Sequence, residues 1–311
     1  MSIPIAIITP CYNQALFLEE AVASVIAQSY PYWELIIIDD GSSDNTAQVS
    51  AHLIDTYANH NIRLLRQQNE GLPASRNNGI ALTSCEYIFP LDADDKIEPT
   101  MLAQTVAILD HRPEVGFVYT DTHLFGSEDS LLHNRAFDRE LLRIDCYLHA
   151  ATLFRRKAWE QVGGYSTAFT RGMEDWDFWL RLVEAGWSGA HIPLPLLHYR
   201  RSETSKLSKG RQLDLELRAQ IILSHAALYE RPFQRWAKRT LSAHWSPKGV
   251  LRSPAHWLMA HASYCTLIAR YAPQELSRLA LRPLFWHLPL SLQTGVRHLG
   301  RKLIASKTWF K

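Results

Sequence analysis

The chain contains 311 residues, of which 47% are hydrophobic, and its formal net charge is +2 at pH 7. This length and composition exclude a disordered chain, because so much apolar material can bury a substantial core. The four cysteines lie far apart without a Cys-x-x-Cys pair, which argues against a disulfide framework or structural zinc and favours a reducing cytoplasm. No basic, apolar leader precedes the first strand, so no signal peptide is predicted.

Strands and helices alternate through the first part of the chain. Short apolar runs predict strands at Ile3–Ile8, Leu35–Ile38, Ile62–Leu65, Tyr87–Leu91 and Val115–Tyr119. Helical patterns lie between them, through Phe17 to Ile26 and over Thr46–Ala58, Ala74–Leu82 and Pro99–Leu109. This order predicts an α/β domain with a mostly parallel, Rossmann-like sheet flanked by helices.

From about Thr122 the alternation weakens, and this half is expected to hold the second substrate. Its recognisable pieces are Ala150–Phe154, a helix at Lys157–Val162, a helix at Asp175–Ala185 and a short strand at Leu196–Leu197. The second helix leaves Glu174 and Asp175 at its N-terminus, where the helix dipole favours a carboxylate. Two roles would explain an aspartate at position 175: capping of the helix, or catalysis.

Three acidic clusters stand at the ends of apolar runs: Asp39-Asp40, Asp92-Ala93-Asp94-Asp95 and Glu174-Asp175. The buried strand before Asp92 delivers its carboxylate and that of Asp94 to the mouth of the sheet, where like charges repel unless a cation lies between them. Hard oxygen ligands suit Mg²⁺ or Mn²⁺ carrying the diphosphate of a substrate. The three clusters together indicate a nucleotide-sugar site.

The chain resembles the family 2 glycosyltransferases of the GT-A fold over roughly residues 3–205. Six landmarks carry the resemblance, at Ile7–Asn13, Asp39–Ser42, Asn69–Asn77, Asp92–Asp95, Gly163–Tyr165 and Glu174–Asp177. It implies an inverting enzyme that uses a nucleotide-diphosphate sugar. Residues 1–121 would then bind the donor and residues 122–205 the acceptor, and a helical region would follow at residues 206–311.

The resemblance also implies which residues bind the donor. Those around the nucleoside would be Pro10, Tyr12, Asp39, Asp40, Asn69, Gly71 and Arg76. A carboxylate of Asp39 or Asp40 can accept from the base or ribose, and the planar guanidinium of Arg76 can stack on or hydrogen-bond the base. Uridine is implied as the base by analogy alone.

The Asp-x-Asp element and the Glu174-Asp175 pair would carry the chemistry. Asp92 would touch the ribose or sugar and Asp94 would hold Mn²⁺ or Mg²⁺, with Asp95 in reserve, and the metal would stabilise the departing diphosphate. Asp175 would be the general base that inversion requires, and Glu174 is the second candidate.

The segment after Leu196–Leu197 differs from the family pattern. Relatives often carry Tyr-Arg-x-His there, and Ser202 stands in place of that histidine. His198 could reach the metal or phosphate, or be structural. Diphosphate clamps could come from Arg200, Arg201, Thr204 and Ser205. The Gln-x-x-Arg-Trp element of processive synthases is missing from the matching region, which implies transfer of a single sugar.

The charge of the chain is unevenly distributed. Residues 232–311 contain thirteen Lys and Arg against one acid, Glu275, for a net charge of about +12, and the remainder is about −10. Basic residues interleaved with tryptophans suit either a peripheral contact with an anionic bilayer or an ordinary helical appendage. No run is long and apolar enough for a confident transmembrane helix, and no motif supports nucleic-acid binding.

The sequence therefore predicts a non-processive glycosyltransferase that acts on a glycan or lipid-linked acceptor in polysaccharide, glycan or glycolipid assembly. We expect it in the cytoplasm or peripherally on the cytoplasmic face of a membrane. One alternative is a non-catalytic scaffold that kept the fold. A sugar nucleotidyltransferase is a weaker alternative, because Thr9–Asn13 is not a glycine-rich phosphate loop.

Overall fold

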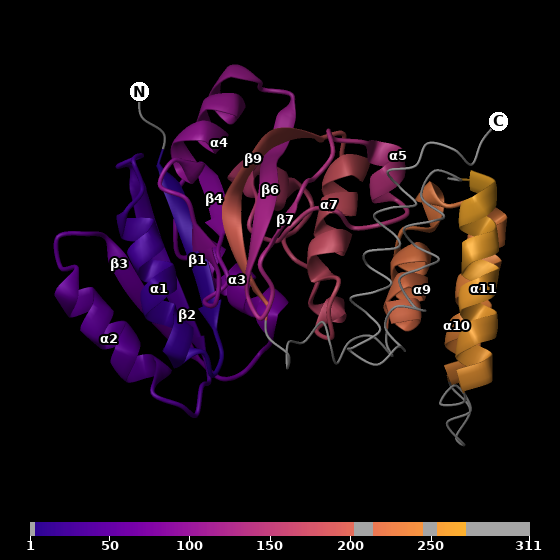
Figure 1. Cartoon of the computed structure of the whole chain (residues 1–311), viewed down its shortest axis with the longest axis horizontal. Coiled ribbons are helices and arrows are strands. Elements are labelled where there is room, and N and C mark those ends of the chain that lie inside the picture. Colours follow the sequence, from indigo (N-terminus) through magenta and orange to yellow (C-terminus); the bar gives the residue numbers. More distant parts are fainter. Residues whose placement is uncertain (1–3, 202–213, 245–253, 272–311) are drawn as a thin grey trace. The chain divides into compact units, whose positions relative to one another are not determined.

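The computed structural model describes residues 4–201, 214–244 and 254–271 (Figure 1). The chain divides into two compact units, Met1–Ser208 and Lys209–Lys311, here called unit 1 and unit 2. The predicted clamp residues Thr204 and Ser205 and most of the basic tail lie outside the described residues.

A single sheet runs through the described part of unit 1. Its strands are β1 (Ile5–Cys11), β2 (Trp33–Asp40), β3 (Ile62–Gln67), β4 (Tyr87–Pro90), β5 (Lys96–Ile97), β6 (Val115–Gly126), β7 (Ser130–Leu132), β8 (Leu153–Arg155) and β9 (Ser188–Arg201). They follow the order β3-β2-β1-β4-β8-β6-β9-β5, and β7 pairs with β6. The first four strands are parallel, as are β6 and β9, whereas β5, β7 and β8 pair antiparallel to their neighbours.

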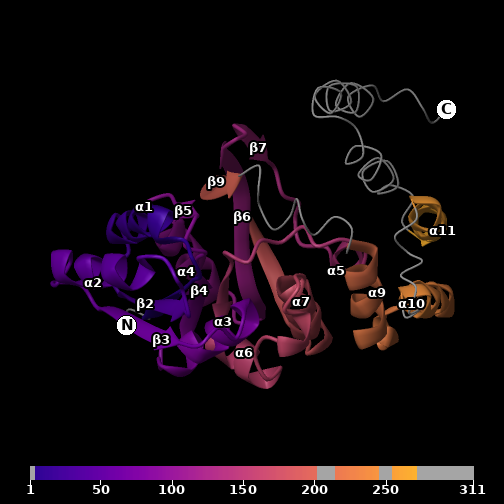
Figure 2. The ribbon, with the colours of Figure 1, turned by 90° about the horizontal axis from the view of Figure 1, so that it is seen from below.

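Helices cover both faces of this sheet. They are α1 (Ala15–Ile26), α2 (Thr46–Thr56), α3 (Leu72–Ala81), α4 (Met101–His111), α5 (Arg139–Leu142), α6 (Arg156–Gln161) and α7 (Glu174–Glu184), with a 3-10 turn η1 (Thr167–Phe169). Side chains alternate along the strands, so Ile7 joins the core under α1, α2 and α4 while Ile8 faces α3. Figure 2 shows α1 and α2 on one side of β1 and β2, with α3 on the other.

Close packing on the second face depends on Gly79 of α3. A Cβ at Gly79 would lie 2.7 Å from Ile38 Cδ1 and 2.9 Å from Ile8 Cγ2, so only glycine lets α3 approach the sheet this closely. On the same face Trp179 of α7 packs on Phe117, with ring centroids 5.2 Å apart. The fold brings the start of α7 to the same side of the sheet as α3.

Two strands are much longer than the sequence predicted. β6 spans twelve residues and β9 fourteen, against the predicted Val115–Tyr119 and Leu196–Leu197. The extension of β6 is polar, and its buried Asp121 is satisfied by His191 Nε2 at 2.7 Å and His133 Nδ1 at 2.9 Å. Pro195 in β9 is tolerated because it sits at a register shift opposite Asp121. Apolar periodicity therefore underestimates the lengths of both strands.

Unit 2 is helical where it is described. It comprises α9 (Asp214–Ser224), the 3-10 turn η3 (Ala226–Leu228), α10 (Arg231–His244) and α11 (Pro254–Tyr271). Phe233 and Trp236 of α10 pack on Tyr264 of α11, with centroids 6.4 and 4.7 Å away. Within the described residues no helix is both long and apolar enough to cross a membrane. The predicted α/β fold with a helical C-terminal region is confirmed.

Candidate functional site

Two carboxylates at the end of β2 fix the loops beside it. Asp40 accepts hydrogen bonds from Gln67 Nε2 at 2.8 Å and from the backbone N–H groups of Glu70 and Gly71 at 2.9 and 3.0 Å. Asp39 accepts from the Ser42 N–H at 2.9 Å and from Arg66 Nε at 3.3 Å. Both side chains are buried, so each shapes a loop at the carboxyl edge of the sheet.

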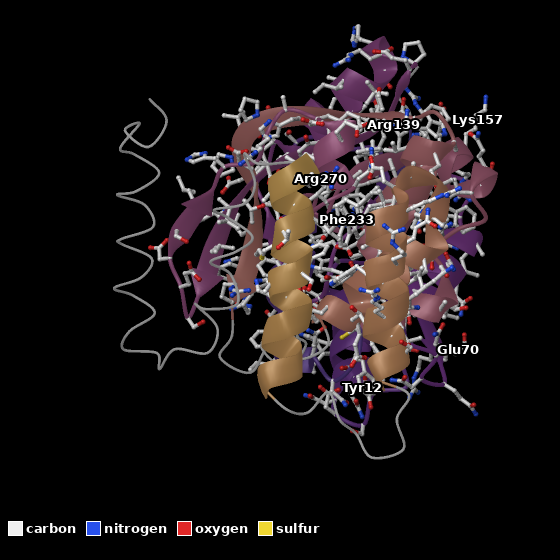
Figure 3. The ribbon with its side chains drawn as sticks, turned by 90° about the vertical axis from the view of Figure 1, so that its right-hand side faces the viewer. Tyr12, Glu70, Arg139, Lys157, Phe233 and Arg270 are labelled. Carbon is white, nitrogen blue, oxygen red and sulfur yellow. The ribbon has the colours of Figure 1, made fainter. Side chains whose placement is uncertain are left out.

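The end of β1 adds an exposed aromatic ring to this edge. Pro10 is buried in β1, and Cys11 lies in register with Asp39, so the next residue, Tyr12, projects beside the β2 loop with 47% of its surface exposed. Figure 3 labels both Tyr12 and Glu70 in its lower half. Asn69 is exposed and Gly71 adopts a φ of +86°, as the loop at the start of α3 requires.

Arg76 does not occupy the position that the resemblance implied. Its side chain has no exposed surface, and its guanidinium bridges Asp92 Oδ1 and Glu174 Oε1, each 2.9 Å away. The guanidinium carbon also lies 5.4 Å from the centre of the Tyr165 ring. A buried cation with two carboxylate partners cannot stack on a base, so the expected base contact of Arg76 is corrected to an ion-pair bridge between the β4 loop and α7.

The three carboxylates of the Asp-x-Asp element have different surroundings. Asp92 is paired with Arg76, Asp94 is partly exposed, and Asp95 is buried. Burial, followed by the charge of Asp92, raises the pKa of Asp94 to about 6. Burial also raises the pKa of Asp95 well above its usual range, and Asp95 Oδ1 accepts the Arg200 N–H at 2.9 Å. Asp92 keeps about a third of its side chain exposed beside its bond to Arg76.

These carboxylates fit a divalent cation that arrives with a diphosphate. Mg²⁺ and Mn²⁺ sites of that kind use one or two carboxylates, and phosphate oxygens complete the coordination. Asp94 and the open side of Asp92 would supply that set. In the described part of the chain no three His, Cys, Asp or Glu side chains gather around one cation position.

The structure does not bring His198 to Asp94. Its ring nitrogens lie against Glu98 Oε1 and, at 3.2 Å, against His123 Nδ1. Arg200 is also engaged, since its Nε donates to the Asp94 carbonyl at 2.9 Å and its terminal nitrogen to Glu20 Oε2 at 3.0 Å. Its guanidinium lies between the rings of Phe17 and Phe125. Arg200 therefore ties β9 to the Asp92–Asp95 loop, whereas His198 ties it to Glu98 and to His123 of β6.

Glu174 and Asp175 have different surroundings at the start of α7. Glu174 is buried and paired with Arg76, whereas Asp175 is partly exposed. Asp175 Oδ1 accepts the Trp176 N–H at 2.7 Å, and Oδ2 has no hydrogen-bond partner among the described residues. Burial, followed by the charge of Glu174, raises the pKa of Asp175 to about 7. Asp175 thus has a free oxygen and a proton affinity suited to a general base.

The sequence reasoning missed two residues beside Asp92. The ring of His149 stacks edge-on against Tyr199 with centroids 4.6 Å apart, and the charge of Asp92 acts on both. Burial lowers the pKa of His149 to about 4, so its imidazole is neutral at pH 7. No motif marks His149, because it stands in an irregular segment before β8 where only the fold places it.

A mostly parallel sheet with acidic clusters after β2 and β4, and a further carboxylate at the start of α7, defines the GT-A class of glycosyltransferases. Two solved structures share this fold: S. aureus TarS 1-349 in complex with UDP-GlcNAc, at 15% identity and a TM-score of 0.61, and the mannosyltransferase PcManGT of Pyrobaculum calidifontis in complex with GDP-Man and Mn²⁺, at 18% and 0.60. The first match covers 99% of this chain and 93% of the TarS 1-349 chain, and the second covers 93% of this chain and 89% of the PcManGT chain. At these identities the likeness establishes the fold alone.

The chain belongs to glycosyl transferase family 2, whose model matches residues 6–170. It is 32% identical over 222 residues to the O-antigen biosynthesis protein RfbC of Myxococcus xanthus. That match covers 69% of this chain but only 17% of RfbC, so the chain spans a small part of that relative. Membership confirms the resemblance seen in the sequence.

Proposed function

We propose that this protein transfers one sugar from a nucleotide-diphosphate sugar, with UDP as the first candidate, to an acceptor hydroxyl with inversion. The observation that carries the proposal is the state of Asp175, which has a free carboxylate oxygen and a raised pKa. Its carboxylate is next to Glu174, which Arg76 links to Asp92. The acceptor is a glycan or lipid-linked glycan in polysaccharide assembly. The similarity to an O-antigen biosynthesis protein supports that class of acceptor.

In this mechanism Asp175 removes the proton of the acceptor hydroxyl. The hydroxyl oxygen attacks the anomeric carbon, and the bond from that carbon to the diphosphate breaks on the opposite face. Oδ2 takes the proton, while the Trp176 N–H holds Oδ1 and fixes the carboxylate orientation. Positioned bases of this kind contribute about 10²–10⁴ in rate. The nucleoside diphosphate leaves, and the configuration at the anomeric carbon is inverted.

Mn²⁺ or Mg²⁺ would be held by Asp94 together with the open side of Asp92. When bound, the metal supplies positive charge to the diphosphate and makes it a better leaving group. Asp95 and the Arg200 backbone support this loop through their mutual hydrogen bond. His198 and Arg200 act by holding β9, and a direct diphosphate contact is left to Thr204, Ser205 and Arg201, whose Nε lies 3.8 Å from Glu128 Oε2.

In this proposal the nucleoside binds at the ends of β1 and β2. Tyr12, two residues after Pro10, offers an exposed ring, and the loops fixed by Asp39 and Asp40 offer backbone groups. The Gly71 N–H bond to Asp40 ties the start of α3 to the same site. A neutral His149 beside Asp92 has one ring donor and one ring acceptor for the sugar hydroxyls.

Replacing Gly71 by Ala is expected to weaken UDP binding by about tenfold, because its φ of +86° strains any residue with a Cβ and the loop must shift. The matched control is Gly186→Ala, since Gly186 has a φ of +96° with nothing within 4 Å of the added Cβ. Calorimetry should find nucleotide affinity unchanged in the control although both variants melt earlier. Equal nucleotide affinities in the two variants would show that this loop is not part of the donor site.

The rate of transfer should depend on pH through Asp175. A base acts only when deprotonated, and the pKa of Asp175 is about 7, so kcat should rise about tenfold per pH unit below pH 7 and level off above it. The measurement is kcat at saturating donor and metal, so that the loss of metal binding as Asp94 protonates near pH 6 does not contribute. A profile that is flat through neutral pH would contradict the assignment of the base.

A further inference from the structure

Helix α10 has an apolar face that is already used within unit 2. Phe233, Trp236 and Ala237 are buried, and Trp236 Nε1 donates to the Ala260 carbonyl of α11 at 2.9 Å. Phe233, a residue of α10, is labelled in Figure 3, and its ring packs against Tyr264 of α11. Whatever binds the other side of α10 therefore meets polar side chains and not an exposed apolar groove.

The opposite face of α10 is cationic. Arg231, Arg235, Lys238 and Arg239, here called the basic stripe, are all exposed and follow i, i+4, i+7, i+8 spacing, which places them along one side of the helix. No acidic residue occurs in α10 or α11. None of the four side chains has an ion pair or hydrogen bond with another residue in the described part of the chain. Four cations in a row without counter-charges are unusual on an ordinary solvated helix.

We propose that the basic stripe of α10 binds the anionic headgroups of a lipid bilayer. The charge of the surrounding sequence agrees in sign, since residues 232–311 contain thirteen Lys and Arg and a single acid. Because the apolar face of α10 packs inside unit 2, binding is electrostatic, reversible and sensitive to salt.

A bilayer fits this surface better than a nucleic acid. Proteins that bind single strands present exposed aromatic rings on which bases stack. In the described part of unit 2 the aromatic side chains of Tyr229, Phe233, Trp236 and Tyr264 are all buried. Among the unit 2 side chains whose burial is described, the basic stripe therefore has no exposed aromatic ring on which a base could stack, and its charge alone suits a headgroup layer.

The test is cosedimentation of the full-length protein with vesicles of phosphatidylcholine alone or mixed equally with phosphatidylglycerol. Wild type should bind only the mixed vesicles and detach at high salt. Changing all four stripe residues to Gln should weaken binding roughly 100-fold to 1,000-fold, because each charge near the surface contributes about 1 kcal/mol. The proposal is independent of the transferase proposal, because vesicle binding is measured without donor or acceptor.

A matched control removes charge elsewhere. Arg139→Gln with Lys157→Gln changes two exposed cations of unit 1, labelled in Figure 3, and should leave vesicle affinity within about twofold. This control is compared with the double variant Arg235→Gln and Arg239→Gln of the stripe, whose vesicle affinity should fall roughly 10–30-fold. Equal losses in the two double variants, or equal binding to both vesicle types, would overturn the proposal. Tighter binding of an oligonucleotide than of mixed vesicles through the same four residues would assign the stripe to nucleic acid instead.

Discussion

Replacing Asp175 by Asn is expected to lower kcat by about 10²–10⁴ and to leave donor affinity within about twofold. The amide keeps the shape of the side chain and can still accept the Trp176 N–H, but it cannot take the proton of the acceptor hydroxyl. The measurement is steady-state turnover with the sugar nucleotide that the protein accepts, together with calorimetric binding of that donor.

Asp177→Asn provides the control for this effect. Asp177 lies in the same helical turn, but it is buried and pairs with Arg181 at 2.7 Å. The control should lose some stability and retain turnover within a few fold, because that pair only anchors the helix. Near-normal turnover in the Asp175 variant, or an equal loss in both variants, would show that Asp175 is not the base.

Replacing Arg76 by Met should lower both stability and activity. Removal of the guanidinium leaves Asp92 and Glu174 as uncompensated charges, and breaking a buried ion pair costs about 3–5 kcal/mol. For a unit of this size we expect the melting temperature to fall by roughly 10 °C. Turnover should fall as well, because Asp92 and the start of α7 lose their common anchor.

Two further variants separate positioning from simple destabilisation. The double variant Arg76→Met with Glu174→Gln removes one of the stranded charges, so it should regain stability without regaining activity. Arg63→Met breaks a surface pair with Glu34 of similar length, 2.7 Å, and should cost no more than about 1 kcal/mol. If the double variant recovers turnover along with stability, Arg76 has no positioning role.

The fold was predictable in the first half of unit 1 because each strand there is a short apolar run bounded by turn residues. Ile36 and Phe89 are fully buried in strands that apolar runs had located. The second half was less predictable, because β6 continues through the polar residue Asp121, whose buried carboxylate has its partners in His133 and His191. A polar residue that is satisfied by another strand has no local signature.

The positions of the acidic clusters followed from the sequence, but the partners of their side chains did not. Arg76 matched a motif and was therefore assigned to the base, yet only the folded chain shows that it is enclosed between Asp92 and Glu174. The difference between Glu174 and Asp175 is also a property of packing, since one is paired with a buried cation and the other is not. Helix periodicity alone could not separate the two.

The most direct test of the central claim is calorimetric binding of UDP, GDP, dTDP and CDP with and without Mn²⁺, to wild type, Asp94→Ala and the exposed-carboxylate control Asp129→Ala. We predict that one nucleotide binds in a metal-dependent way, and that Asp94→Ala loses this binding at least about tenfold while the control does not. If no nucleotide binds wild type in the presence of Mn²⁺, or if Asp94→Ala binds as wild type does, the proposed donor site is contradicted.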